Sequence, residues 1–270
     1  AETATNISLR TTGEVTIDKV GAGVAKVQTG TGGKLSINAT SINVDSQITA
    51  NAGAVQLVAG NGGLNLGSQA VVDVNGITKS FFDVERYAPA GNITLESTGA
   101  LNVAPTASLN FAAANKGGDA GTLKLVANGA LNLQGQLNGS AKTGQLGGSF
   151  TLLSTQAVDL NALADALVAG KVNGKVAVTT QQGNLQLGTG KTLQAQEISL
   201  VAKGGAGQND SNNGNIIIDG TVNASGQKGG DIRLTGSSSV VINGSLLATA
   251  STSDQRGGNI TIATQGTGDG

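Results

Sequence analysis

Few side chains in the sequence have the types and spacing that catalysis requires. Enzymatic cleavage of a polysaccharide needs two carboxylates about 5 to 10 Å apart, one to protonate the leaving group and one to attack or to activate water. Asp159 is expected to point outward from a strand, but Asn132 and Gln186 occupy the matching positions of the neighbouring repeats. Asp219 and Asp231 fall at predicted corners. We therefore expect no catalytic residues and no enzymatic activity.

Metal and cofactor chemistry has equally little support in the sequence. The chain has no Cys and no His, which excludes Cys/His zinc sites, thiol nucleophiles and His-based triads. The segment Asn209–Gly214 is similar in composition to a calcium loop, but it lacks the spacing and the terminal Glu of an EF-hand. We expect this segment to be a solvated loop, and we expect the chain to bind no metal and no cofactor.

Ser80–Tyr87 is the one atypical segment, because it combines charged residues with three of the chain's five aromatic residues. Aromatic side chains beside charges are typical of recognition surfaces. In one interpretation the segment folds back and buries Phe81 and Phe82 against the flank of the fold. In the other interpretation it is a loop that binds a partner through Phe81, Phe82, Asp83, Glu85, Arg86 and Tyr87.

Leu160–Val168 places apolar residues at helical spacing. We predict a short helix inserted over residues 161–170, which either docks onto the rest of the fold or contacts a partner laterally. Two further insertions are predicted as loops, over residues 75–92 and 203–214. Turns that point outward from a scaffold tolerate such insertions.

Composition restricts the scaffold that carries these segments. The chain has 270 residues with 43 Gly, four Phe, one Tyr and no Trp, so its core must be built from small aliphatic side chains. It has 16 basic and 17 acidic residues and no dense basic cluster, which argues against nucleic-acid binding. No apolar run reaches the ~20 residues that a membrane-spanning helix needs, so we expect no membrane insertion.

The sequence is repetitive. Each repeat opens with two apolar residues that flank a small or polar one, and the ten openings between Ile7 and Ile262 recur at a mean spacing of about 28 residues. Such alternation predicts strands with one buried face. The openings are Ile7–Leu9, Leu35–Ile37, Val55–Leu57, Ile93–Leu95, Leu123–Leu125, Phe150–Leu152, Val176–Val178, Ile198–Leu200, Ile232–Leu234 and Ile260–Ile262.

A second alternating stretch follows most openings, and a third short apolar stretch completes the repeat. One repeat of three strands and three turns cannot bury its own inner face, so the repeats must stack in parallel. This predicts an all-β fold, a right-handed parallel β-helix (β-solenoid) of about nine to ten triangular coils, with the handedness taken from the general bias of parallel crossover connections. The second stretches are Val15–Ile17, Ile42–Val44, Leu64–Leu66, Leu101–Val103, Leu131–Leu133, Val158–Leu160, Leu185–Leu187 and Val240–Ile242.

Pairs of glycines precede several openings and are expected to mark one corner of the cross-section, because Gly tolerates the backbone conformations that sharp corners need. We expect residues 1–270 to form a single continuous β-helix segment that is uncapped at both ends, because no amphipathic helix covers either end. The glycine pairs are Gly32–Gly33, Gly117–Gly118, Gly147–Gly148, Gly229–Gly230 and Gly257–Gly258.

Several runs resemble the repeats of filamentous-haemagglutinin-like exoproteins of two-partner secretion. They are Gly229–Leu234, Val240–Leu246, Gly257–Ile262, Asn128–Leu133 and Thr98–Val103. The resemblance implies a secreted protein on the outer surface of a Gram-negative bacterium, exported through an outer-membrane transporter. The Asn-Pro-Asn motifs of the family's secretion domain are missing, since the only prolines are Pro89 and Pro105. The segment is therefore expected to come from the central β-helical shaft, with the transporter engaged by a region absent here.

The resemblance implies a structural and adhesive role in surface attachment, aggregation or contacts within a biofilm matrix. The expected partners are a host or bacterial surface glycan or protein, or a matrix polysaccharide. Two alternatives stay open: a stalk that carries a toxin at its far end, and a subunit of a self-assembling extracellular filament associated end to end or laterally.

Overall fold

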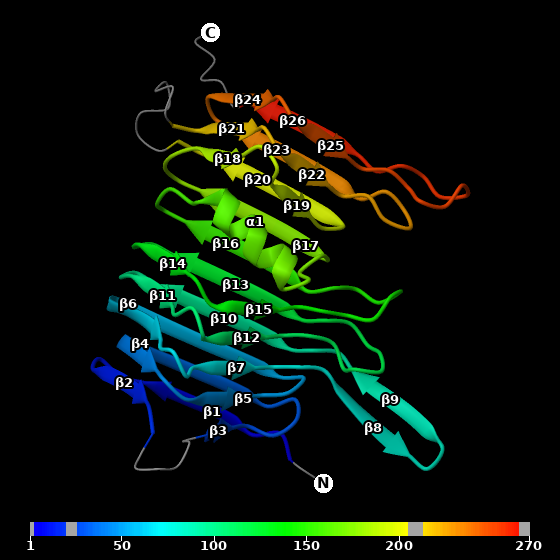
Figure 1. The fold of residues 1–270 in the computed structure, drawn as a ribbon. Helices are drawn as coiled ribbons and strands as arrows, with labels where there is room; N and C mark the ends of the chain where they lie inside the picture. The colour runs from blue at the N-terminus through cyan, green and yellow to red at the C-terminus, as the bar shows by residue number, and fades with distance from the viewer. Residues whose placement is uncertain (1–2, 20–25, 205–212, 265–270) are drawn as a thin grey trace. The chain divides into compact units, whose positions relative to one another are not determined.

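The computed structural model describes residues 3–19, 26–204 and 213–264 (Figure 1). The described chain is mostly β-strand in long parallel sheets, which is compatible with a parallel β-helix or β-solenoid. It separates into unit 1, residues 1–151 with 170–172, and unit 2, residues 152–169 with 173–270. The division falls within β16 (Ser149–Ser154).

Unit 1 contains two parallel sheets and a hairpin. Its larger sheet follows the order β1, β4, β6, β10 and β13, with β2, β11 and β14 paired to its longer strands. These strands are β1 (Asn6–Arg10), β2 (Glu14–Ile17), β4 (Lys34–Val44), β6 (Ala54–Leu66), β10 (Asn92–Ser97), β11 (Leu101–Val103), β13 (Thr122–Ala127) and β14 (Leu131–Leu133). The smaller sheet contains β3 (Lys26–Gln28), β5 (Gln47–Thr49), β7 (Val71–Asp73), β12 (Ser108–Asn110) and β15 (Gln136–Asn138).

Unit 2 contains three parallel sheets and a helix. The first sheet is β17 (Lys175–Thr180), β20 (Glu197–Ala202), β23 (Asp231–Gly236) and β26 (Ile260–Thr264). The second is β18 (Leu185–Leu187), β21 (Asn215–Ile218) and β24 (Ser239–Ile242). The third is β19 (Thr192–Gln194), β22 (Thr221–Asn223) and β25 (Ser245–Leu247).

All ten predicted openings lie in strands, and equivalent residues of successive repeats are paired in register. In unit 1, Val55 pairs with Leu35 on one side and with Ile93 on the other. In unit 2, Ile198 pairs with Val176 and Ile232. These aliphatic residues are at most 2% exposed. The period-2 prediction is therefore confirmed, and the core of each unit consists of columns of aliphatic side chains.

Glycines line the corner that precedes these strands, because the backbones of neighbouring repeats approach closely there. A Cβ on Gly91 would lie 1.8 Å from the carbonyl oxygen of Gly53, and one on Gly230 would lie 1.8 Å from that of Gln196. Gly117 and Gly118 do not belong to this corner, contrary to the prediction, since Gly121 occupies it instead. The pair lies beside the ring of Tyr87.

Helix α1 (Leu160–Ala169) confirms the predicted helix and corrects the strand predicted over 158–160. The Asp159 carboxylate accepts hydrogen bonds from the backbone N–H groups of Asn161 and Ala162, at 2.9 and 3.0 Å, so it caps the helix. The helix buries Leu160, Leu163, Ala164 and Leu167. Within the described ranges, no helix has the length and apolar character that crossing a membrane requires.

A partly buried polar ladder accompanies the aliphatic columns of unit 2. Asn215 is 6% exposed. Its side-chain amide donates a hydrogen bond to the side-chain oxygen of Asn184 at 3.0 Å. Its own oxygen accepts from the Ser239 hydroxyl at 2.6 Å. Three successive repeats are thus linked by half-buried and buried side chains that satisfy one another's hydrogen bonds.

Candidate functional site

The outward face of the first sheet of unit 2 carries two rows of polar side chains. The first row runs from Lys175 through Glu197 to Asp231, which are paired in register on β17, β20 and β23. Alternate residues of a strand share a face, so a second row lies two residues further along, about 6.6 Å away. It consists of Ala177, Ser199, Arg233 and Thr261.

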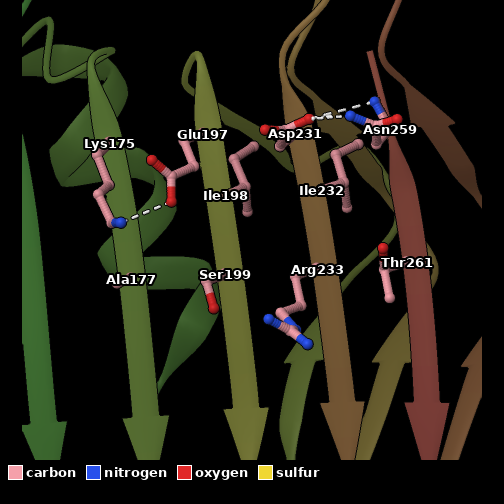
Figure 2. Close-up of a pocket in the computed structure, with 10 residues that line it drawn as sticks. All are labelled: Lys175, Ala177, Glu197, Ile198, Ser199, Asp231, Ile232, Arg233, Asn259 and Thr261. Carbon is pink, nitrogen blue, oxygen red and sulfur yellow. Dashed lines mark hydrogen bonds and ion pairs between the residues drawn. The ribbon is translucent and has the colours of Figure 1, made fainter.

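Hydrogen bonds fix the first row (Figure 2). The Lys175 ammonium lies 2.5 Å from a Glu197 carboxylate oxygen. An Asp231 carboxylate oxygen accepts from the Asn259 side chain at 2.9 Å and from the Asn259 backbone N–H at 3.3 Å. Neighbouring strands are about 4.8 Å apart, so the Glu197 and Asp231 carboxylates are adjacent.

The surface around these rows is hollowed. A depression of about 530 Å³ covers both rows, and a second of about 490 Å³ shares Glu197, Asp231 and Asn259 with it. The two depressions adjoin, and we call them together the outer groove. The second extends the groove to Lys228, Asp254 and Arg256.

Charge is concentrated in the outer groove. It gathers seven of the chain's 33 charged side chains, so this face is far more charged than the average surface of the protein. The cations are Lys175, Lys228, Arg233 and Arg256, and the carboxylates are Glu197, Asp231 and Asp254.

Arg233 differs from the other charged groups of the rows. Figure 2 shows its guanidinium in the second row with Ser199 and Thr261, away from the carboxylates of the first row. Among the described residues, no side chain forms an ion pair or a hydrogen bond with this guanidinium. Its five N–H donors are therefore open to a ligand in the groove.

Sequence reasoning missed the adjacency of Glu197 and Asp231. Asp231 was predicted at a corner, and it does follow the Gly230 corner, but it is the first residue of β23 and pairs with Glu197. The signal was present, because each residue immediately precedes an aligned opening, Ile198 or Ile232. Asp219, also predicted at a corner, accepts from Gln186 at 3.1 Å and from Asn243 at 2.8 Å. These hydrogen bonds, the one from Asn243 most, lower the Asp219 pKa.

The adjacent carboxylates do not have the surroundings of a catalytic pair. A glycosidase keeps one carboxyl protonated in an apolar site. The Glu197 side chain is instead 47% exposed and joined to a lysine. Asp231 is exposed and bound to Asn259. The absence of catalytic residues stays a prediction.

The predicted partner-binding segment forms an antiparallel hairpin of β8 (Ile77–Phe81) and β9 (Val84–Ala88) (Figure 1). Phe81 is 60% exposed and Phe82, at the turn, is fully exposed with φ at +54°. The interpretation that both rings are buried against the flank is therefore wrong. The two strands pair only with each other in the described chain, so the turn residues project away from the sheets.

Strand β9 of the hairpin is fixed by side-chain contacts, in contrast to the tip. Glu85 forms an ion pair with Lys116 and accepts a hydrogen bond from the Tyr87 hydroxyl at 3.1 Å. The hydrogen bond from Lys116 lowers the Glu85 pKa, and the same bond raises the Lys116 pKa. Desolvation, followed by the bond to Glu85, raises the Tyr87 pKa. The structure thus separates Glu85 and Tyr87, which hold the hairpin, from Phe81, Phe82 and Asp83 at its tip.

The sequence did not identify Lys116, which lies 31 residues from Glu85 along the chain. Arg86 pairs with Lys79 across the hairpin and is exposed. The calcium-like segment Asn209–Gly214 lies mostly outside the described residues. Over the ranges that the structure covers, no group of three or more acidic side chains is arranged to hold a metal ion.

Comparisons with known proteins identify no relative of this chain. No known protein family matches the chain, and no curated protein or solved structure is similar to it. The case for a function therefore depends on the repeats, the outer groove and the hairpin.

Proposed function

We propose that the chain is a section of the shaft of a secreted surface fibre of the filamentous-haemagglutinin type, with a structural and adhesive role. In this proposal the units are parts of one right-handed parallel β-helix with about nine to ten triangular coils of roughly 28 residues. The protein would then lie on the outer surface of a Gram-negative bacterium, exported by two-partner secretion.

The observation that carries the proposal is the in-register pairing of equivalent residues in successive repeats. Each added repeat extends the aliphatic columns and the hydrogen-bonded sheets in the same direction. Such a structure grows in length without needing a larger core, as a shaft requires. Its stability comes from contacts between neighbouring repeats, so a chain without Cys needs no disulfides.

The outward residues support the adhesive part of the proposal. On the sheet of unit 1, Ser36, Gln56 and Thr94 form a paired column of polar side chains on the outer face. Groups of this kind make weak hydrogen bonds to glycans or to neighbouring fibres. Repetition along a shaft converts weak contacts into avidity. The exposed tip of the hairpin favours a direct contact with a partner over a passive spacer.

Two measurements test this proposal. Electron microscopy of the purified chain should show rods about 43 Å long, from nine repeat spacings of about 4.8 Å. Beads coated with the chain should attach to bacterial or host cells more than beads coated with an unrelated β-sheet protein. Compact round particles would contradict the shaft, and equal attachment of the two kinds of bead would contradict the adhesive role.

A further inference from the structure

The second row of the outer groove contains an unpaired cation between two hydroxyl-bearing residues. Arg233 pairs with Ser199 on β20 and with Thr261 on β26, so all three lie in register on neighbouring strands. Adjacent members are about 4.8 Å apart. The row therefore offers a guanidinium flanked on both sides by groups that donate or accept hydrogen bonds.

The geometry of this row points to a carboxylate ligand. A guanidinium binds a carboxylate through two parallel N–H···O bonds, which fixes the orientation of the ligand as well as its charge. Ser199 and Thr261 flank the guanidinium, so they can form hydrogen bonds with hydroxyl groups on the same ligand. A carboxylic acid that bears hydroxyl groups thus fits the row better than a simple anion.

The first row supplies the complementary groups. Glu197 and Asp231 are held by Lys175 and Asn259, so their remaining oxygen lone pairs face the groove as fixed acceptors for sugar hydroxyls. The same carboxylates repel a densely charged polyanion, such as a heavily sulfated glycan or a nucleic acid. A neutral glycan would leave the Arg233 guanidinium without a charged partner.

We infer that the outer groove binds an acidic saccharide, with the carboxylate of a uronic acid residue on Arg233 and its hydroxyls on Glu197 and Asp231. The adjoining depression, with Lys228 and Arg256, extends the site for a further sugar of a linear chain. The inference deepens the proposed adhesive function and rests on it for its biological setting. It names the class of surface or matrix polysaccharide that the shaft would contact.

Calorimetric titration of the whole chain with a short oligogalacturonate tests the inference. The methyl ester of the same oligomer is the matched ligand, because it keeps the sugar and removes the charge. We expect saturable binding of the acid, and binding of the ester weaker by about tenfold or more, since a hydrogen-bonded charged group contributes this much. Arg233→Gln should weaken binding of the acid by a similar factor.

Lys124→Gln is the control variant, because Lys124 occupies the equivalent middle position of the opening Leu123–Leu125 in unit 1. It should bind the acid as the unchanged protein does. Arg233→Lys, which keeps the charge but loses the planar fork, should bind with intermediate affinity. Melting curves of all variants identify any loss of binding that is due to unfolding.

Three results would overturn the inference: no binding of the acid by the unchanged protein, equal binding of acid and ester, or unchanged affinity in Arg233→Gln. Tighter binding of a sulfated oligomer than of the uronide would also overturn the assignment. None of these results decides whether microscopy shows rods or whether coated beads attach to cells. Failure of the saccharide assignment is therefore distinguishable from failure of the proposed function.

Discussion

The first sheets of the two units have the same register and different outer surfaces. In both units the inward positions of the openings from Leu35 to Leu234 are apolar and buried, whereas those of Ile7–Leu9 and Ile260–Ile262 are exposed. The middle outward positions in unit 1 are Ser8, Ser36, Gln56, Thr94 and Lys124. Those in unit 2 are Ala177, Ser199, Arg233 and Thr261, beside a first row with three charged residues. The inward residues determine the fold, so they are alike in both units. The outward residues are not constrained by the core, so they can differ between the units.

The units also place their charged and aromatic groups differently. Unit 2 places a charged groove directly on the strands of its sheet, so the residues that line the groove alternate along the strands with core residues. Unit 1 places aromatic and charged residues on a hairpin that pairs with neither of its parallel sheets. A change in the hairpin should therefore affect stability less than a change in the strands under the groove.

Among the changes at the groove and the hairpin, the largest effect is expected at the glycine corner beneath the groove. Gly230→Ala places a Cβ 1.8 Å from the Gln196 carbonyl oxygen, so the neighbouring repeats must separate, at a cost of about 3 kcal/mol. Gly257→Ala is the control, because its nearest neighbour would be 3.7 Å away, and it should change stability by less than about 0.5 kcal/mol. Urea unfolding followed by circular dichroism measures both. Equal stability of the two variants would refute the close approach at this corner.

A change at the hairpin tip should have a smaller effect of the opposite sign. Phe82→Gly removes a ring that is fully exposed and relieves the positive φ, so the variant should be as stable as the parent or more stable by about 1 kcal/mol. If the tip contacts a partner, attachment of coated beads should fall in the same variant. Phe111→Ala, at a fully buried ring, is the contrasting substitution and should cost about 4 kcal/mol. A loss of stability in Phe82→Gly would mean that the ring packs against the protein.

The ion pair of the groove should contribute little to stability. Lys175 and Glu197 side chains are 46% and 47% exposed, so Lys175→Gln should cost about 0.5 kcal/mol or less. Lys34→Gln, at the equivalent position before the opening in unit 1, provides the comparison. A cost well above this value, reduced by salt, would show that the row stabilises the sheet as well as shaping the groove.

The smallest effects are expected in acid, with opposite signs in the two units. Hydrogen bonds lower the Asp219 pKa in unit 2, so this carboxylate stabilises the fold above its unfolded pKa near 3.8, and the contribution is lost as the pH falls through the folded value. Burial raises the Asp73 pKa in unit 1, so its contribution is present below the unfolded value and is lost as the pH rises through the folded one.

Substitution by asparagine separates these two contributions. Asp219→Asn should reduce the loss of stability below about pH 4, whereas Asp73→Asn should raise stability at neutral pH. Thermal melts across the acid range measure both variants. The assignment fails if the two substitutions change the pH profile in the same direction.

Much of this fold could be predicted from the sequence, because a period of two residues specifies which side chains face inward. The ten openings needed only that pattern, and the helix needed only the spacing of Leu160, Leu163 and Leu167. The strand predicted over 158–160 failed because an Asp before a helical pattern caps a helix. Three residues that alternate between apolar and polar are compatible with a strand and with the start of a helix, so they cannot distinguish these two structures.

The candidate site was harder to predict, because it depends on pairing between distant residues. Glu197 and Asp231 are 34 positions apart, and β21, β22 and connections of variable length separate their strands, so adjacency follows only after the openings are aligned. The pair of Glu85 and Lys116 depends on the path of the chain after the hairpin, which no periodicity specifies. The exposure of Phe81 and Phe82 depends on the length of β8 and β9 in the same way.

The polar ladder of Asn184, Asn215 and Ser239 has a consequence for folding. Aliphatic columns are nearly identical from one repeat to the next, so a strand that docks one repeat too early buries its apolar face almost as well. The same mistake would leave the Asn215 amide buried without its partners, at a cost of about 1 to 3 kcal/mol for each unmet group. The ladder therefore favours the correct register during folding, because a repeat that docks on the wrong neighbour loses these hydrogen bonds.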